Sequence, residues 1–312
     1  MKDKITIICP NERFAKAWTD SIRKQVPDFE VQLYPDDTNR NDVEFLMAFN
    51  PPQGVFSLYP NLKVVASMGA GVRTILTGTG LPENVIVTKI VQPMHQRDIA
   101  DFVLALALGH MRRIPEFFHQ QKEKIWRHHP FQRPQDTTAG IMGIGAIGKV
   151  IGELFLKNDF KVTGWSRTPK QIDNIRTFYG DDQKNAFLTT AQILVCILPL
   201  TDATEGILNK KTFNQLPKGA FLINVARGGH VVDKDLIDAL DNGQLSGAAL
   251  DVFREEPLPP EHPFWTNKKI LISPHNAGNT HPDVAFRKVL QNYYAMKKGE
   301  PLVDVVDRKR GY

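Results

Sequence analysis

A glycine-rich turn constrains this chain more than any other feature. It reads Gly143-Ile144-Gly145-Ala146-Ile147-Gly148 and joins a strand-like run at 139–142 to a helix-like stretch at 149–157. In such a turn the glycines allow a tight bend, a close approach of the backbone to a pyrophosphate, and close packing of helix against strand. The N-terminus of the helix then holds the anion. A purely structural turn is the alternative, but the strand-turn-helix context predicts dinucleotide binding at Gly143, Gly145, Ala146, Ile147 and Gly148.

The residue at the end of the next strand-like run, 162–165, indicates which dinucleotide is bound. Proteins that bind NAD place an Asp or Glu there, about 20 residues after the first glycine, against the ribose hydroxyl groups. This chain has Ser166, followed by Arg167 and Thr168. A carboxylate would repel a 2′-phosphate, whereas a hydroxyl and a guanidinium can donate hydrogen bonds to it. We therefore expect these three residues to bind NADP, although an Arg167 that only faces solvent would leave NAD equally acceptable.

Short apolar runs alternate with helix-compatible stretches along all 312 residues. The expected strands are Ile5–Cys9, Val31–Tyr34, Phe45–Phe49, Val64–Ser67 and Val85–Thr88 in the first part, and Ala139–Met142, Val162–Trp165, Ile193–Leu198, Ala220–Val225, Gly247–Phe253 and Ile270–Ser273 in the second. This alternation predicts an α/β fold with doubly wound parallel sheets. A chain of this length usually forms two domains.

Two helices have recognisable features. The stretch Arg97–Arg113 is apolar around almost its whole circumference, which predicts a long helix buried on most sides. The segment Thr280-His281-Pro282 is typical of a helix start, with Thr280 as N-cap and Pro282 in the first turn.

Composition excludes several classes of protein. With 42% hydrophobic and 23% charged residues, the chain is typical of globular proteins. Its net charge of +5 comes from scattered Lys and Arg residues, so no basic stripe for nucleic acid is present. No apolar run has the roughly 18 residues that a membrane span needs, and the first residues lack the pattern of a signal peptide. We therefore expect a cytosolic protein, and we expect no disulfide between its two cysteines, Cys9 and Cys196.

Three polar residues follow expected strands of the second series, namely Arg227, Glu256 and His275. Parallel α/β sheets bind ligands beyond the carboxyl ends of their strands, so these side chains are candidates for chemistry. Each alone has an ordinary structural explanation, but their shared edge favours a joint site. Leu198, Pro199 and Ala226 also follow such strands, and we expect them to bind the cofactor. The adjacent His128 and His129 lack further ligands, so no metal site is predicted.

These residues lie in segments that resemble the D-isomer-specific 2-hydroxyacid dehydrogenase family. The segments are Asn224–Gly229, Asp251–Leu258 and Ser273–His275. Within the family the chain is most similar to reductases of glyoxylate and hydroxypyruvate, through Gly164–Thr168, Glu256–Pro260 and the ending Val306–Tyr312. The resemblance covers nearly the full length. It implies a flavodoxin-like substrate domain (residues 1–95 and 283–312) with a Rossmann-like NADP-binding domain (residues 96–282) inserted into it, and a homodimer made largely through the cofactor domains.

The resemblance also implies roles for individual residues. His275 would protonate the carbonyl oxygen of a 2-oxo acid while hydride arrives at the carbon from the nicotinamide. Glu256 would bind the other ring nitrogen, which sets the tautomer and favours the charged imidazole. Arg227 would bind the substrate carboxylate and polarise the carbonyl, for which a planar guanidinium suits better than a lysine. Asp251 would accept a hydrogen bond from the nicotinamide carboxamide, unless the backbone around it already occupies its carboxylate.

The N-terminal part contains Met68-Gly69-Ala70-Gly71-Val72, which resembles the family's substrate-binding glycine loop. Gly69, Ala70 and Gly71 would present backbone N–H groups to the substrate carboxylate. The family usually continues with Asp, whereas this chain has Arg73, which leaves the substrate preference open. Trp126 lies in a loop from which related dimers send an aromatic residue to the partner's active site, and packing in its own core is an equal alternative.

Two other functions are compatible with the sequence. A family member could act on bulkier branched-chain or aromatic 2-oxo acids, which pocket volume would decide. A non-catalytic dinucleotide sensor is also conceivable, since the corepressors known as C-terminal-binding proteins resemble this fold, but the chain has no obvious interaction tail. Formate dehydrogenases pair the active-site His with Gln, where this chain has Glu256.

Overall fold

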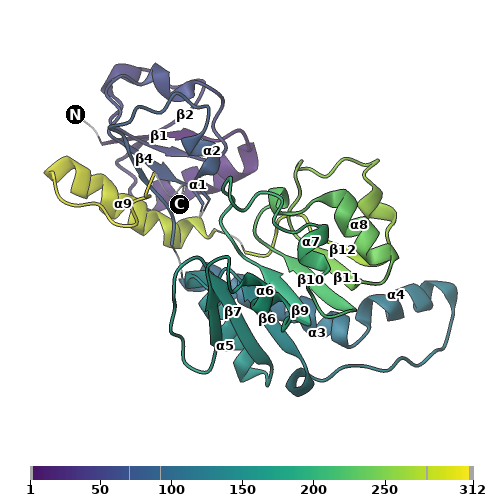
Figure 1. Ribbon diagram of the computed structural model, residues 1–312. Helices are drawn as coiled ribbons and strands as arrows, with labels where there is room; N and C mark the ends of the chain where they lie inside the picture. Colours follow the sequence, from purple (N-terminus) through teal and green to yellow (C-terminus); the bar gives the residue numbers. More distant parts are fainter. Residues whose placement is uncertain (1–2, 70, 92, 279, 309–312) are drawn as a thin grey trace. The chain divides into compact units, whose positions relative to one another are not determined.

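The computed structural model describes residues 3–69, 71–91, 93–278 and 280–308. The chain divides into two compact units (Figure 1), of which the first comprises Met1–His95 and Thr280–Tyr312 and the second comprises Gln96–Asn279. The second unit is therefore inserted into the first. The border between residues 279 and 280 lies three residues before the predicted one.

The first unit contains a parallel sheet of five strands in the order β2-β1-β3-β4-β5. Its strands are β1 (Lys4–Ile8), β2 (Glu30–Leu33), β3 (Phe45–Ala48), β4 (Val64–Ser67) and β5 (Ile86–Thr88). This order is the flavodoxin-like one. Helices α1 (Glu12–Gln25) and α9 (Pro282–Lys298) contact each other, and their buried Trp18 and Phe286 join one apolar cluster with the sheet. The last helix of the chain thus completes the core of the first unit.

The second unit contains a sheet of seven strands, all parallel, in the order β12-β11-β10-β9-β6-β7-β8. The strands are β6 (Thr138–Met142), β7 (Lys161–Ser166), β8 (Arg176–Tyr179), β9 (Ile193–Cys196), β10 (Ala220–Asn224), β11 (Leu245–Leu250) and β12 (Ile270–Ile272). This is the dinucleotide-binding strand order, extended by β12. The two sheets confirm the predicted α/β class with two parallel, doubly wound units.

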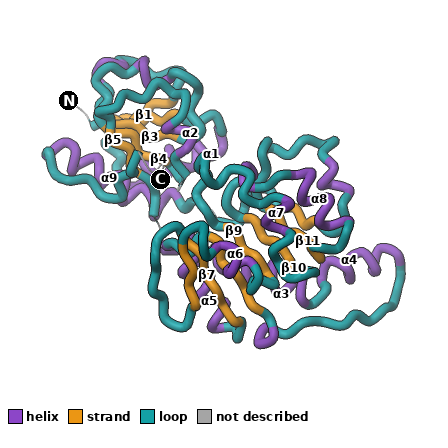
Figure 2. Tube along the Cα trace, in the orientation of Figure 1, coloured by secondary structure: helices purple, strands orange, loops and turns teal. Residues whose placement is uncertain are grey.

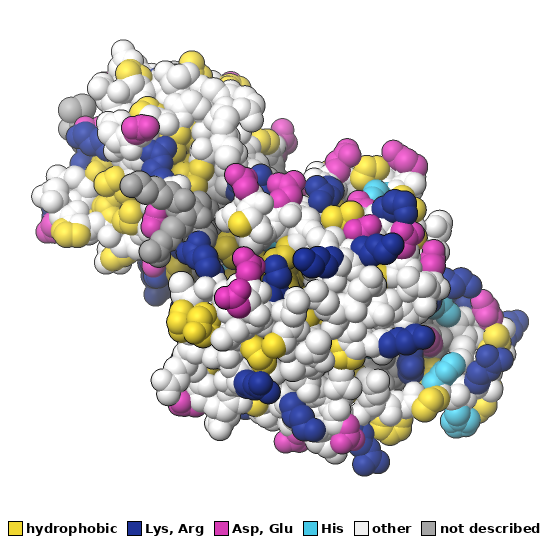
Figure 3. Space-filling view, viewed as in Figure 1, with side chains coloured by type: hydrophobic (Ala, Val, Ile, Leu, Met, Phe, Trp, Pro, Cys, Tyr) yellow, Lys and Arg dark blue, Asp and Glu magenta, His cyan; other side chains and the backbone are white. Residues whose placement is uncertain are grey.

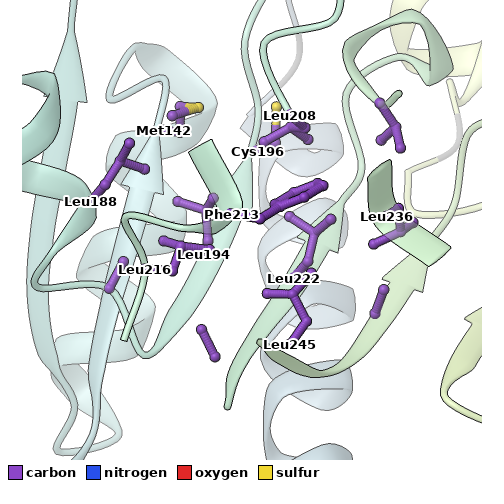
Figure 4. Close-up of a cluster of buried hydrophobic side chains, with 14 of the residues drawn as sticks. Met142, Leu188, Leu194, Cys196, Leu208, Phe213, Leu216, Leu222, Leu236 and Leu245 are labelled. Carbon is purple, nitrogen blue, oxygen red and sulfur yellow. The ribbon is translucent and has the colours of Figure 1, made fainter. Parts of the chain in front are cut away.

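Helices cover both faces of the larger sheet (Figure 2). The covering helices are α3 (Pro93–Met111), α5 (Ala146–Lys157), α6 (Lys184–Leu188), α7 (Lys210–Phe213) and α8 (Asp233–Asp241), whereas α4 (Ile114–Glu123) buries no residue. On one face, α6 to α8 enclose an apolar cluster in which Phe213 packs among Leu208, Leu222 and Leu236 (Figure 4). On the other face, α3 and α5 enclose a second cluster. Burial on both faces explains why these strands read as unbroken apolar runs.

Three details differ from the predictions. Strand β8 was not expected, because it lies at the sheet edge and buries only Phe178. Helix α3 buries one face, at Ile99, Val103 and related positions, while its other apolar residues are only partly buried or exposed. Thr280 is not an N-cap, since α9 starts at Pro282 and His281 therefore precedes it.

No helix in the described ranges combines the length and the apolar composition that a membrane crossing requires. Both cysteines are free thiols, Cys196 buried in β9 and Cys9 partly buried after β1. Burial raises the pKa of Cys196 to about 12, so this thiol is not poised for reaction.

Candidate active site

The carboxyl ends of the parallel strands in the second unit meet at one edge of the sheet. Register pairs at that edge link Met142 with Trp165 and Cys196, and Asn224 with Leu250. Every predicted site residue of this unit follows one of these strand ends directly or by a short loop. The topology therefore brings them to a common edge, as expected for an α/β ligand site.

The glycine turn has the geometry that a phosphate-binding turn requires. Gly143 has φ +112°, and a Cβ there would lie 2.8 Å from the Ile197 carbonyl oxygen. A Cβ on Gly148 would lie 2.2 Å from the Gly143 carbonyl oxygen, so both positions need glycine. Helix α5 begins at Ala146 directly behind Gly145, and within the described residues no side chain caps its N-terminus. Backbone N–H groups at its first turn, including those of Ala146 and Ile147, can therefore bind an anion.

The end of β7 carries no carboxylate at the ribose position. Ser166 is partly buried, and its Oγ donates a 2.8 Å hydrogen bond to the Thr168 carbonyl oxygen, which closes a small turn. Arg167 and Thr168 are exposed on that turn. The arrangement presents a hydroxyl and a guanidinium next to the strand end, which suits a phosphate.

His275 and Glu256 form the central pair of the site. Nδ1 of His275 lies 2.7 Å from Oε2 of Glu256, and the other carboxylate oxygen accepts a 2.9 Å bond from the Phe253 N–H. Partial burial raises the pKa of Glu256, but the bonds from His275 and Phe253 and the charge of Arg227 outweigh it, so the pKa lies below its usual value. Because the ionised carboxylate occupies Nδ1, Nε2 is the ring nitrogen of His275 that can exchange a proton with a substrate.

Arg227 follows β10 in extended backbone and is partly buried. Nη1 donates to the Ala226 carbonyl oxygen. Burial lowers the pKa of Arg227 and the negative charge of Glu256 raises it in part, with a net decrease. The guanidinium keeps its charge, because the pKa of arginine starts far above neutrality. A partly desolvated cation near Glu256 is suited to an anionic ligand.

Asp251 is only 1% exposed and holds the loop that carries His275. Its Oδ1 accepts bonds from Ser273 Oγ (2.6 Å) and the Asn276 N–H (2.8 Å), and its Oδ2 accepts from the Ala277 N–H (2.9 Å). Its carbonyl oxygen accepts from the His275 N–H at 2.8 Å. These bonds support the left-handed backbone of His275, whose φ is +52°. The predicted bond from Asp251 to a nicotinamide carboxamide stays a prediction.

The loops after β9 and β10 contain the other expected cofactor residues. Leu198 is partly buried, Pro199 is exposed and Ala226 is buried. Sequence analysis missed one residue here, His230, which is wholly buried and hydrogen-bonded to the carbonyl oxygens of Pro199 and Arg227. The one sequence feature that could have indicated His230 is its position, three residues after the candidate Arg227.

The predicted substrate-binding loop lies in the first unit, after β4. Ser67 Oγ bonds to the backbone of Gly69 and to the Gly71 carbonyl oxygen, which gives the loop a fixed start. Ala70 lies outside the described residues. Arg73 is exposed at the start of the short helix α2 (Arg73–Leu76). The role of this loop in substrate binding stays a prediction.

Helix α4 and the loop that follows it form an exposed arm of the second unit, residues 112–137. Trp126 is 93% exposed, so the alternative in which it packs in its own core is wrong. His129 contacts Gln120, and the described residues contain no group of three or more His, Cys, Asp or Glu side chains that could hold a metal ion. Figure 3 shows basic, histidine and hydrophobic side chains together on this part of the surface.

Comparisons with known proteins agree with this geometry. A family model described as "D-isomer specific 2-hydroxyacid dehydrogenase, NAD binding domain" matches residues 104–277. Glyoxylate/hydroxypyruvate reductase A of Yersinia enterocolitica is 37% identical over 307 residues, which cover 96% of each chain. The protein of the same name from Photorhabdus laumondii is 36% identical over 304 residues, again 96% of each chain.

Solved structures show the same architecture. A D-isomer specific 2-hydroxyacid dehydrogenase from Xanthobacter autotrophicus, in complex with NADPH and MES, has a TM-score of 0.92 and 33% identity over 100% of both chains. An NADPH-dependent glyoxylate/hydroxypyruvate reductase from Sinorhizobium meliloti, in complex with NADP and sulfate, has a TM-score of 0.92 and 32% identity over 100% of both chains.

Proposed function

Because the chain belongs to the D-isomer-specific 2-hydroxyacid dehydrogenase family, we propose that it reduces small 2-oxo acids, glyoxylate and hydroxypyruvate, with NADPH. Membership of this family supports an oxidoreductase activity and an NAD(P) cofactor. The two finer elements, the small substrate and the preference for NADP, are the proposal. Relatives with 36–37% identity bear the name of such reductases, and a similar structure contains NADPH.

The site residues fit a dinucleotide. Gly143 and Gly148 leave backbone space that any Cβ would fill, and the uncapped start of α5 lies behind them. Ser166 replaces the carboxylate that would bind an NAD ribose, and the exposed Arg167 adds a positive charge. These features support NADP over NAD.

The chain's own residues supply binding and proton transfer. When bound, the reduced nicotinamide supplies the hydride that attacks the carbonyl carbon. Arg227 binds the carboxylate of the 2-oxo acid and polarises its carbonyl through a planar, partly desolvated guanidinium. His275 donates the proton from Nε2 to the developing alkoxide, while Glu256 stabilises the charged ring through Nδ1.

The bond of 2.7 Å between His275 and Glu256 carries the catalytic part of this proposal. A sensor that only binds dinucleotides has no need for a carboxylate-supported imidazole. The decisive experiment measures NADPH and NADH oxidation with glyoxylate, hydroxypyruvate, pyruvate and branched-chain 2-oxo acids. Higher kcat/KM with NADPH and the two small substrates is expected. Preference for NADH or for branched substrates contradicts the finer proposal, and no turnover contradicts the enzymatic role.

We propose further that a second copy of the chain covers the exposed arm, residues 112–137. Helix α4 has no buried residue, and large apolar side chains along the arm are exposed. These are Ile114, Phe117, Phe118, Ile125, Trp126 and Phe131. Water contact of so many apolar groups in one segment is typical of an interaction surface.

Analytical ultracentrifugation tests this homodimer. The wild type should sediment as a dimer of the 35.2 kDa chain. Phe118→Glu combined with Trp126→Glu should shift it to monomer, whereas Val284→Glu, an exposed apolar position on α9, should not. A monomeric wild type, or a double variant that still dimerises, contradicts the proposal.

A further inference from the structure

The buried histidine of the site, His230, has no part in the chemistry described above. It ends the short turn Gly228–His230, three residues after Arg227, and its relative exposure is 0%. A buried imidazole is costly unless its nitrogens are hydrogen-bonded. The hydrogen-bond partners of the two ring nitrogens of His230 therefore indicate its role.

Both ring nitrogens face backbone carbonyl oxygens. Nδ1 lies 2.9 Å from the Arg227 oxygen and Nε2 lies 3.3 Å from the Pro199 oxygen. A carbonyl oxygen only accepts, so the nitrogen bonded to it must donate. The contact at Nδ1 is the shorter of the two, so the N–H at Nδ1 is the stronger donor. His230 thus donates its strongest bond to the backbone of the arginine of the site.

The Arg227 oxygen is held from three directions. Besides Nδ1 of His230 it accepts from Asn224 Nδ2 at 3.1 Å and from the His230 N–H at 3.2 Å. Asn224 also holds the backbone before Arg227, since its Oδ1 accepts from the Ala226 N–H at 3.2 Å. The backbone from which the guanidinium extends is therefore defined by two wholly buried side chains.

We propose that His230 is a positioning residue that places the Arg227 guanidinium for its anionic ligand. The inference rests on the proposed function, in which Arg227 binds the 2-oxo acid. A displacement of about 1 Å at such a group can cost about a hundredfold in rate. The contact to Pro199 is longer, and that oxygen already accepts from Thr204 Oγ1 at 2.7 Å, so it contributes less to placing Arg227.

A matched pair of variants separates the two contacts. His230→Asn puts an amide N–H close to the place of Nδ1 and keeps the bond to Arg227. His230→Gln reaches the place of Nε2 and keeps only the contact to Pro199. We expect His230→Asn to stay within about threefold of wild type, and His230→Gln to raise KM for glyoxylate about tenfold and lower kcat, with KM for NADPH unchanged.

Packing alone would give a different result. If His230 only fills space, both variants should lose thermal stability and activity alike, and that outcome overturns the proposal. Should His230→Gln not fold, His230→Phe replaces it, because it keeps the ring volume without either nitrogen and has the same expected loss. Equal activity of His230→Asn and His230→Phe would likewise overturn the proposal.

A readout without turnover keeps this test separate from the proposed function. The Nε–Hε NMR signal of Arg227, assigned by its absence in Arg227→Lys, should shift or broaden in His230→Gln and remain in His230→Asn. An unmoved signal in His230→Gln contradicts the positioning role. If the wild type reduces no 2-oxo acid, the proposed function fails, while this signal still decides whether His230 places Arg227.

Discussion

His275 and Glu256 come from loops after two neighbouring strands and meet at 2.7 Å through Nδ1 and Oε2. The backbone of Phe253 holds the other carboxylate oxygen, so the carboxylate is fixed before it supports the ring. The pair thus combines a ring suited to proton transfer with a carboxylate that fixes the ring at Nδ1.

Replacing His275 by Gln should lower kcat for glyoxylate reduction by about a hundredfold to ten-thousandfold, the usual range for a positioned acid. The Kd of NADPH should remain near that of the wild type, because His275 belongs to the chemical step. Steady-state kinetics and NADPH fluorescence titration measure the two quantities. Near-normal turnover removes His275 from the mechanism.

Glu256→Gln should give an intermediate loss of kcat, about tenfold to a hundredfold, because the acid remains and only its support is weakened. Glu255→Gln, at the adjacent exposed residue, is the matched control and should change little. A loss in Glu256→Gln that equals that of His275→Gln would indicate that the carboxylate acts directly on the substrate.

Arg227→Lys should reduce kcat/KM for glyoxylate about tenfold to a hundredfold although the charge is kept. A charge-assisted hydrogen bond contributes about 1.5 to 3 kcal/mol, and an ammonium cannot reproduce the bidentate geometry of a guanidinium. Initial rates over a range of glyoxylate concentrations measure the effect. Unchanged KM and kcat would show that Arg227 does not touch the substrate.

Ser166→Asp should reverse the cofactor preference. A carboxylate at this strand end repels a 2′-phosphate but can bind ribose hydroxyl groups, so kcat/KM with NADPH should fall at least about tenfold while that with NADH is kept. Ser166→Ala is the control, since it removes one hydrogen bond worth about 1 kcal/mol. Equal effects of both variants on NADPH would show that charge at residue 166 is irrelevant.

Much of this architecture follows from local patterns. The strands of both sheets are apolar because helices bury them, so their runs are visible in the sequence. Strand β8 was not predicted, because it lies at the sheet edge and Phe178 is its one buried residue, so it has no apolar run. The glycine turn was predictable from its spacing and context, and the space at Gly143 and Gly148 excludes any side chain, as those roles require.

The hydrogen bonds behind the site were not predictable. The sequence places Asp251 in the expected strand Gly247–Phe253, but the bonds from Ser273 and Ala277 depend on the conformation of a loop more than 20 residues later. His230 gave no periodic signal, and its partners are backbone oxygens that any sequence would supply. Trp126 lies in a loop without periodicity, so its exposure could not be inferred.

We expect His110 in α3 to make the stability of the protein depend on pH. Its ring stacks on Phe221 with centroids 3.8 Å apart, and Nε2 bonds to Ser246 Oγ at 3.0 Å. Burial, and after it the charge of Arg113, lower the pKa of His110, Glu116 opposes them in part, and the net pKa is about 4. An unfolded histidine titrates near 6.5. Between these values only the unfolded chain binds the proton, so stability falls as the pH drops from about 6.5 to about 4.

The loss over that window is of the order of 3 kcal/mol, because each pKa unit corresponds to about 1.4 kcal/mol. Urea unfolding at pH 7, 6, 5 and 4.5 should show it in the wild type. His110→Gln keeps a donor for Ser246 but cannot titrate. The carboxylates are the same in both proteins, so their contribution cancels in the difference between the two free energies of unfolding. That difference should therefore shrink steadily as the pH falls. Parallel curves at all four pH values would mean that His110 is protonated to the same extent in the folded and unfolded chain.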